Sequence, residues 1–136
     1  MRNSLSFDDV LLEPQYSDIK SRSEVDIGKH LSETAYLELP VISSPMDTVT
    51  EDEMAWIMYD EGGLGVVHRY NTIEEQVALV KKRRGFKAAA VGVTGEYEER
   101  ACALYDAGIH YLCLDVAHGH HALVKNALKT LRGTFG

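Results

Sequence analysis

Cysteine is scarce in this sequence, and long apolar runs are missing from it. The 136 residues include two cysteines, Cys102 and Cys113. Such a count excludes the disulfide framework of small secreted domains and favours a reducing, cytoplasmic setting. No run approaches the roughly 18 consecutive apolar residues of a membrane-spanning helix. Residues 1–10 lack the apolar core of a signal peptide, so we expect a cytoplasmic protein without a membrane partner.

Basic residues are also few compared with acidic residues. The chain has 14 lysines and arginines against 21 aspartates and glutamates, which gives a net charge of −7. Proteins that bind DNA or RNA need a basic surface for the phosphates, so a nucleic acid is not an expected partner. A small phosphorylated ligand is still compatible with this charge, because backbone amides at a helix N-terminus can hold one.

Short apolar segments recur along the chain at intervals of 23 or 24 residues, and such regular spacing is a repeat signal. The segments begin at Val41, Gly65, Ala88 and Tyr111. Apolar residues at helical spacing follow each segment. The glycines expected to end these helices are Gly62, Gly85, Gly108 and Gly133. The second helix is also expected to end on the basic run 81–84, where positive charge is favourable.

Threonines that can cap free amides stand at or near three of the expected helix starts. They are Thr50, Thr72 and Thr94. Thr50 and Glu53 also have the spacing of a capping box. The sequence therefore marks both ends of the helices that alternate with the apolar segments.

Continuous apolar strands that alternate with helices are typical of a parallel sheet covered by helices. A doubly wound sheet and a barrel both fit, and the regular spacing favours the barrel. A complete (β/α)8 barrel has eight units and typically about 250 residues. We therefore expect an α/β fold of the TIM-barrel type, with about the first four strand–helix units present after an N-terminal extended segment. Residues 1–136 would form the N-terminal half of the barrel.

In parallel α/β folds the functional site lies at the C-terminal ends of the strands. Residues that could form a site, most of them polar, gather at the four expected strand ends. They are Ser43, Ser44, Met46 and Asp47 after the first strand, His68 and Arg69 after the second, Gly92 and Thr94 after the third, and Asp115, His118 and Gly119 after the fourth. We expect one rim of the sheet to carry the site.

Several blocks of the sequence carry a resemblance to a known family. They are LSFDDVLLEPQYSDI near the N-terminus, SSPMDTVTE after the first strand, EGGLGVVHRYNTIEEQ around the second and LDVAHGH at the fourth. Together they resemble the inosine monophosphate dehydrogenase and guanosine monophosphate reductase family. The resemblance implies a barrel enzyme that binds a purine nucleoside monophosphate and NAD or NADP. It also implies a homotetramer and, in the dehydrogenase branch, a monovalent cation such as potassium.

The same resemblance implies roles for individual residues. Ser44 and Met46 would contact the purine nucleotide. The residues that match cofactor-contacting positions are Asp115, Val116, Ala117, Arg69, Ser21 and Arg22. An ionised aspartate such as Asp115 can accept two ribose hydroxyls. Ser21 and Arg22, in the segment KSRSEVD, match a reductase segment that reaches the cofactor of a neighbouring subunit.

The branch of the family is left open by these motifs. SSPMDTVTE, EGGLG and AHGH favour the dehydrogenase, which converts IMP to XMP with NAD, and we prefer that interpretation. KSRSEVD and CLDVA favour the reductase, which converts GMP to IMP with NADPH. The CBS domains that most dehydrogenases insert after the second helix are not expected, because VKKRRGFKAAAVGV passes straight into the third strand. A non-catalytic half-barrel that binds nucleotide or assembles with another chain is the third alternative.

No catalytic residue is expected within the chain. In the family the nucleophilic cysteine lies on a loop after the sixth barrel strand, and Cys102 and Cys113 are expected to be inert packing residues. We expect Asp47 to orient its loop through backbone amides and His68 to be a buried, hydrogen-bonded histidine. The histidines of HGHH, at 118–121, lack a partner with metal-ligand spacing, and one of them is expected to start the fourth helix, so no metal site is expected.

Overall fold

The computed structural model describes residues 4–82 and 84–136. Arg83, within the expected basic helix end, lies outside the described residues. The elements are η1 (Arg22–Glu24), β1 (Lys29–His30), β2 (Tyr36–Leu37), β3 (Ile42–Ser43), α1 (Asp52–Asp60), β4 (Leu64–Val67), α2 (Ile73–Lys82), β5 (Ala88–Val91), α3 (Tyr97–Asp106), β6 (Tyr111–Leu114) and α4 (Ala122–Phe135). All four expected strand–helix units are therefore present.

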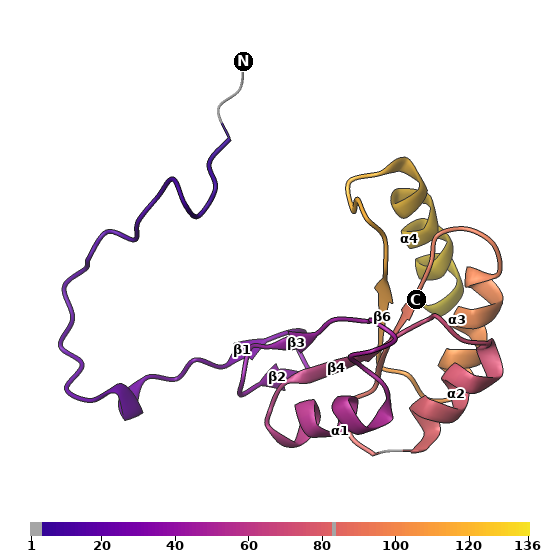
Figure 1. Cartoon of the computed structure of the whole chain (residues 1–136), viewed down its shortest axis with the longest axis horizontal. Coiled ribbons are helices and arrows are strands. Elements are labelled where there is room, and N and C mark those ends of the chain that lie inside the picture. Colours follow the sequence, from indigo (N-terminus) through magenta and orange to yellow (C-terminus); the bar gives the residue numbers. More distant parts are fainter. Residues whose placement is uncertain (1–3, 83) are drawn as a thin grey trace.

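The four strands of the repeat form one parallel sheet in chain order, β3-β4-β5-β6. Each of the helices α1 to α4 follows its strand, and Figure 1 shows the helices succeeding one another around the outside of the sheet. Strands that pair in sequence order, each with its helix on the outer side, are the arrangement of consecutive barrel units. The predicted α/β fold is confirmed.

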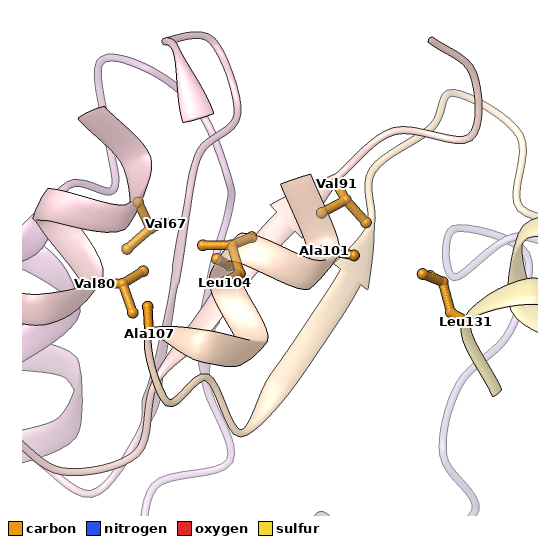
Figure 2. Close-up of a cluster of buried hydrophobic side chains, with 8 residues drawn as sticks. Val67, Val80, Val91, Ala101, Leu104, Ala107 and Leu131 are labelled. Carbon is orange, nitrogen blue, oxygen red and sulfur yellow. The ribbon is translucent and has the colours of Figure 1, made fainter. Parts of the chain in front are cut away.

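Apolar side chains of β4 and β5 alternate between the two faces of the sheet, as strand geometry requires. On the outer face, Val67 and Val91 pack with Leu104 of α3 and Val80 of α2 in one buried cluster. Figure 2 shows Leu104 in the middle of this cluster, with Leu131 of α4 approaching from the far side. The helices are therefore held on the sheet by a continuous apolar layer.

The inner face of the sheet has a second, smaller core. Leu64, Val66, Ala88 and Ala90 pack there with Leu37 of the β1–β2 hairpin. The hairpin is antiparallel, with His30 opposite Tyr36. The hydroxyls of Ser32 and Tyr111 lie 2.9 Å apart and join the hairpin to β6. The hairpin therefore covers part of the face that the helices leave uncovered.

The helix signals in the sequence were correct at some ends and wrong at others. Gly62 follows α1 at a φ of +82°, a backbone conformation that glycine adopts without steric cost. Thr72 and Glu75 form a capping box at α2: the Thr72 amide donates to Glu75 Oε2 at 2.9 Å and the Glu75 amide to Thr72 Oγ1 at 3.1 Å. Gly133 does not end α4, which continues to Phe135.

The capping box expected at Thr50 and Glu53 is also wrong. The N-cap of α1 is Glu51, and its side chain makes no capping bond. Thr50 is fully buried and its hydroxyl bonds to the loop before the helix instead. At α3 the N-cap is Glu96, again without a side-chain capping bond, so Thr94 does not cap that helix.

The expected N-terminal extended segment is confirmed. Residues 4–28 form an arm that projects from the α/β body, and η1 lies on it (Figure 1). Apolar side chains on the arm are almost fully exposed, with Phe7 at 99% and Leu11 and Leu12 at 97%. Among residues 4–82 and 84–136, no helix combines the length and apolar character needed to cross a membrane.

Candidate functional site

The loop after β3 is shaped by Thr50. Its hydroxyl donates to the backbone carbonyl of Ser44 at 2.7 Å and lies 2.9 Å from the hydroxyl of Ser43. The carbonyl of Met46 accepts from the amides of Val49 and Thr50, both at 3.0 Å, which closes a turn. Ser44 is exposed, and the side chain of Met46 is 50% exposed. The loop therefore presents both residues to solvent from a fixed backbone.

Asp47 does not have the role that the sequence suggested. Its carboxylate makes no hydrogen bond to any other residue within 4–82 and 84–136. The loop is ordered by the backbone turn at Met46 and by the buried hydroxyl of Thr50, so the expected orienting function of Asp47 is wrong. A hydroxyl that is buried beside two acceptors fixes the loop better than an exposed carboxylate.

His68 is the buried, hydrogen-bonded histidine that we expected. It is 3% exposed, and its Nδ1 accepts a hydrogen bond from the Tyr70 amide at 3.1 Å. Because Nδ1 is the acceptor, the ring proton lies on Nε2, which faces Glu51 Oε1 at 3.4 Å. His68 therefore links the loops that follow β3 and β4.

Arg69 and Asp115, two of the expected cofactor residues, form an ion pair. Arg69 Nε donates to Asp115 Oδ2 at 3.0 Å, and Nη2 donates to the Asp115 carbonyl at 3.2 Å. The Asp115 amide donates to the carbonyl of Val91 at 2.9 Å. The ends of β4 and β6 are thus joined across the end of β5, where Gly92 lies next to the guanidinium.

The ion pair retains hydrogen-bonding capacity that faces solvent. The side chains of Arg69 and Asp115 are 33% and 26% exposed. Among the residues that the structure describes, Asp115 Oδ1 and Arg69 Nη1 have no hydrogen-bond partner. The guanidinium also lies over the ring of Tyr70, 5.2 Å from its centroid. A carboxylate acceptor beside a guanidinium donor suits a ligand that both donates and accepts, such as a ribose diol or a carboxamide.

A groove opens beside this rim, between the loops after β3 and β4. Its walls include Asp47, Glu51, His68, Tyr70 and Asn71. Glu75 and Lys82 of α2 also line it. Three carboxylates against one lysine would repel a phosphate group, so the groove is unsuited to the phosphate of a nucleotide.

The loop from β6 to α4 carries the remaining rim residues. Val116 is partly buried and Ala117 is exposed, directly after Asp115. The Nδ1 atom of His121 accepts from the Leu123 amide at 3.1 Å, so this histidine caps α4 as expected. The rings of His118 and His120 lie 6.4 Å apart. In the described part of the chain, no three His, Cys, Asp or Glu side chains converge as metal ligands would.

Ser21 and Arg22 are not brought to this rim. Both belong to the arm, where the Ser21 hydroxyl accepts from the Ser23 amide at 3.3 Å and caps η1. Both side chains are exposed. Any contact of these two residues with a cofactor therefore has to be made away from the rim of their own sheet.

Both cysteines lie on the expected elements, but one of them is exposed rather than packed inside the protein. Cys102 is exposed on α3, so its predicted packing role is wrong. Cys113 is partly buried in β6, and its burial, together with the negative charge of Asp115, raises the pKa of its thiol. A raised pKa disfavours the reactive thiolate, which agrees with an inert Cys113.

Sequence reasoning missed two buried polar residues, Gln76 and Arg100. Gln76 is 0% exposed and Arg100 is 7% exposed. A signal was available, because Gln76 stands three residues after Ile73 and four before Val80, on the apolar stripe of α2. Polar residues on a buried stripe must find partners inside the protein, and these two bond to each other and to the loop that carries Arg69.

Comparison with known proteins identifies the family to which this arrangement belongs. A family model described as the IMP dehydrogenase / GMP reductase domain matches residues 4–136. The chain belongs to this family. Its members are NAD(P)-dependent oxidoreductases that bind purine nucleotides, and the β3-β4-β5-β6 sheet with its helices is part of the family's TIM barrel.

Individual relatives come from both branches of the family. The chain is 49% identical over 81 residues to inosine-5'-monophosphate dehydrogenase of Nitrosopumilus maritimus, which covers 60% of the chain and 17% of the relative. It is 49% identical over 78 residues to GMP reductase of Leishmania donovani, covering 57% and 16%. It is 52% identical over 81 residues to inosine-5'-monophosphate dehydrogenase of Staphylococcus aureus strain MW2, covering 60% and 16%. The chain thus spans about a sixth of the length of these curated relatives.

Proposed function

We propose that residues 1–136 form the N-terminal half of the TIM-barrel catalytic domain of a purine nucleotide oxidoreductase, without CBS domains. The favoured activity is that of IMP dehydrogenase, which converts IMP to XMP with NAD. The ion pair of Arg69 with Asp115 carries the proposal, because it puts a free acceptor and a free donor together at the strand ends. That edge is where ligands bind in parallel α/β folds.

The residues at this edge fit the nicotinamide end of NAD or NADP. Asp115 Oδ1 would accept a hydrogen bond from a ribose hydroxyl, while Arg69 Nη1 would donate to a ribose or carboxamide oxygen. Val116 and Ala117 would add backbone contacts next to Asp115. When bound, the cofactor would accept or supply a hydride. The protein groups hold and orient it, with the ion pair fixed by two bonds between Arg69 and Asp115.

The loop after β3 is proposed as the nucleotide contact. The hydroxyl of Ser44 is exposed, and it makes no hydrogen bond to the described residues. The half-exposed thioether of Met46 is soft and adaptable, which suits the flat face of a purine. Ser44→Ala should therefore weaken nucleotide binding by roughly 0.5–1.5 kcal/mol and leave the fold almost unchanged.

The reductase is the second candidate, supported by the position of Ser21 and Arg22 on the projecting arm (Figure 1). An arm that leaves its own body can reach a neighbouring subunit, as the reductase segment does, and this fits a homotetramer. A reductase would favour GMP with NADPH, and a dehydrogenase would favour IMP with NAD. A non-catalytic half-barrel would bind a nucleotide at the same rim without turnover.

Nuclear magnetic resonance of the 15N-labelled chain tests the proposal. NAD, NADP, IMP and GMP are titrated separately, and the preferred pair indicates the branch. We expect the cofactor to shift the amides of Gly92 and Val116 and the Arg69 Nε–H, and the nucleotide to shift Ser44 and Met46. Asp115→Ala should abolish the cofactor shifts, whereas Asp106→Ala, at the end of α3, should leave them unchanged.

Two outcomes would contradict this assignment. One is the absence of saturable shifts for all four ligands, and the other is shifts that saturate but lie outside the strand-end loops. Turnover is measured in parallel with IMP plus NAD and with GMP plus NADPH. None is expected from this chain, because Cys102 lies on α3 and Cys113 within β6 rather than on a strand-end loop. Turnover that survives replacement of both cysteines by serine would refute the cysteine-dependent mechanism.

A further inference from the structure

Gln76 reaches from α2 into the strand ends and bonds to the backbone there. Its Nε2 donates to the carbonyl of His68 at 2.8 Å and to that of Ala90 at 2.9 Å. Its Oε1 accepts from Arg100 Nη1 at 2.9 Å. Both amide protons and the amide oxygen are used, so rotating the amide by 180° would place Oε1 against two carbonyls. The orientation of Gln76 is therefore fixed.

Arg100 extends this network from α3 to the loop between β4 and α2. Its Nη2 donates to the carbonyl of Asn71 at 3.0 Å, and its Nη1 lies 3.4 Å from the carbonyl of Thr72. No carboxylate among residues 4–82 and 84–136 lies within ion-pair distance of Arg100. A buried guanidinium that is neutralised only by carbonyl dipoles is costly. All the hydrogen bonds that Arg100 donates go to Gln76 or to the loop between β4 and α2.

The network holds the backbone on both sides of the Arg69–Asp115 ion pair. His68, which precedes Arg69, is held by Gln76, and Asn71, two residues after Arg69, is held by Arg100. Ala90 is also held by Gln76, and the next residue, Val91, accepts the amide of Asp115. Arg69 is thus one or two residues away from two backbone groups that the network fixes, and Asp115 is hydrogen-bonded to the residue that follows a third.

We propose that Gln76 and Arg100 are positioning residues that set the geometry of Arg69 against Asp115, and thereby the affinity of the rim for a nicotinamide dinucleotide. That the ligand is a nicotinamide dinucleotide rests on the proposed function. The effect of Gln76 and Arg100 on the geometry of the Arg69–Asp115 ion pair does not depend on that function. Arg69 lies on the loop between β4 and α2, whose backbone is held by Gln76 at His68 and by Arg100 at Asn71. Removing the anchors supplied by Gln76 would let the guanidinium leave Asp115 while the apolar core stays intact.

The test compares Gln76→Met and Arg100→Lys with matched controls in this chain. Methionine has nearly the shape of glutamine but donates no hydrogen bond. Lysine keeps the positive charge of Arg100 but loses the guanidinium, which donates through both Nη1 and Nη2. Gln15→Met, on the arm, and Arg132→Lys, on the exposed end of α4, make the same chemical changes away from the network. Hydrogen exchange of the Arg69 Nε–H and the dissociation constant for NAD are measured for each variant, together with urea unfolding.

We expect both network variants to speed exchange of the Arg69 Nε–H and to weaken NAD binding by about tenfold, the equivalent of one lost hydrogen bond. The two controls should change neither quantity by more than about twofold. Folded network variants that keep slow Arg69 exchange would overturn the proposal, even if their midpoint of unfolding fell, because that result describes a purely structural network. If Gln76→Met does not fold, the milder variant Arg100→Lys tests the proposal instead. Slow exchange of the Arg69 Nε–H in folded Arg100→Lys would then overturn it. If the wild-type chain does not bind NAD, the proposed function fails, but the exchange measurement still decides the positioning role.

Discussion

Gly65 should be among the least replaceable residues in this chain, because α1 lies directly against it. A Cβ atom at Gly65 would lie 2.3 Å from Ala55 Cα, 2.8 Å from Ala55 Cβ and 3.2 Å from the Ala55 carbonyl carbon. Two of these three atoms are backbone, so no side-chain rotation can relieve the contact. Carbon atoms pack at about 3.5–4.0 Å, so α1 would have to move away from β4 by more than about 1 Å.

The expected cost of Gly65→Ala follows from this geometry. Overpacking of a well-packed core costs about 1–3 kcal/mol, and alanine recovers roughly 0.5–1 kcal/mol of backbone entropy that glycine loses in a strand. A net loss of about 1 kcal/mol, with an m-value of about 2 kcal/mol per molar urea, lowers the unfolding midpoint by about 0.5 M. Far-ultraviolet circular dichroism during urea unfolding measures that shift.

Gly133→Ala is the matched control for Gly65→Ala. Gly133 lies inside α4, and a Cβ atom there would meet nothing within 4 Å. Alanine should therefore stabilise the chain, by up to about 1 kcal/mol. If Gly65→Ala unfolded at the wild-type midpoint with an unchanged slope, α1 would not approach β4 as closely as described, and the packing argument would be refuted.

Three further predictions follow from the loops, the cysteines and the sheet edges. Thr50→Val, which removes a buried hydroxyl with two partners, should lower the free energy of unfolding by about 1–3 kcal/mol. Asp47→Ala should change it by less than about 0.5 kcal/mol, and urea unfolding that reversed this order would restore the orienting role of Asp47. Iodoacetamide at pH 7.5 should label exposed Cys102 much faster than Cys113, because burial and a nearby negative charge raise the pKa of the Cys113 thiol; mass spectrometry of the labelled peptides that showed equal rates would contradict this. The sheet has β3 and β6 at its edges, and unpaired edges favour association, so sedimentation should show oligomers as concentration rises, and a monomer at high concentration would count against it.

The sequence by itself determined the strand–helix units and the edge of the sheet that carries the candidate site. The expected strand starts at Ala88 and Tyr111 coincide with those of β5 and β6, and the starts at Val41 and Gly65 differ by one residue from those of β3 and β4. Apolar runs, helical spacing and glycines act over a few neighbouring residues, so they can be recognised without knowing the fold. A rule of parallel α/β architecture then places Arg69 and Asp115 at the same edge.

Only the tertiary structure decided which side chains meet at that edge. Arg69 and Asp115 are 46 residues apart, and their pairing depends on the register of three strands. The position of Gln76 on the apolar stripe of α2 indicates burial, but only the packing of α2 against α3 makes Arg100 its partner. Gly133 carries a local stop signal, but α4 continues through it to Phe135, whose ring stacks on Tyr105 of α3. Local propensities amount to at most about 1 kcal/mol per residue, so packing between elements overrides them, and the partners that decide such packing are distant in the chain.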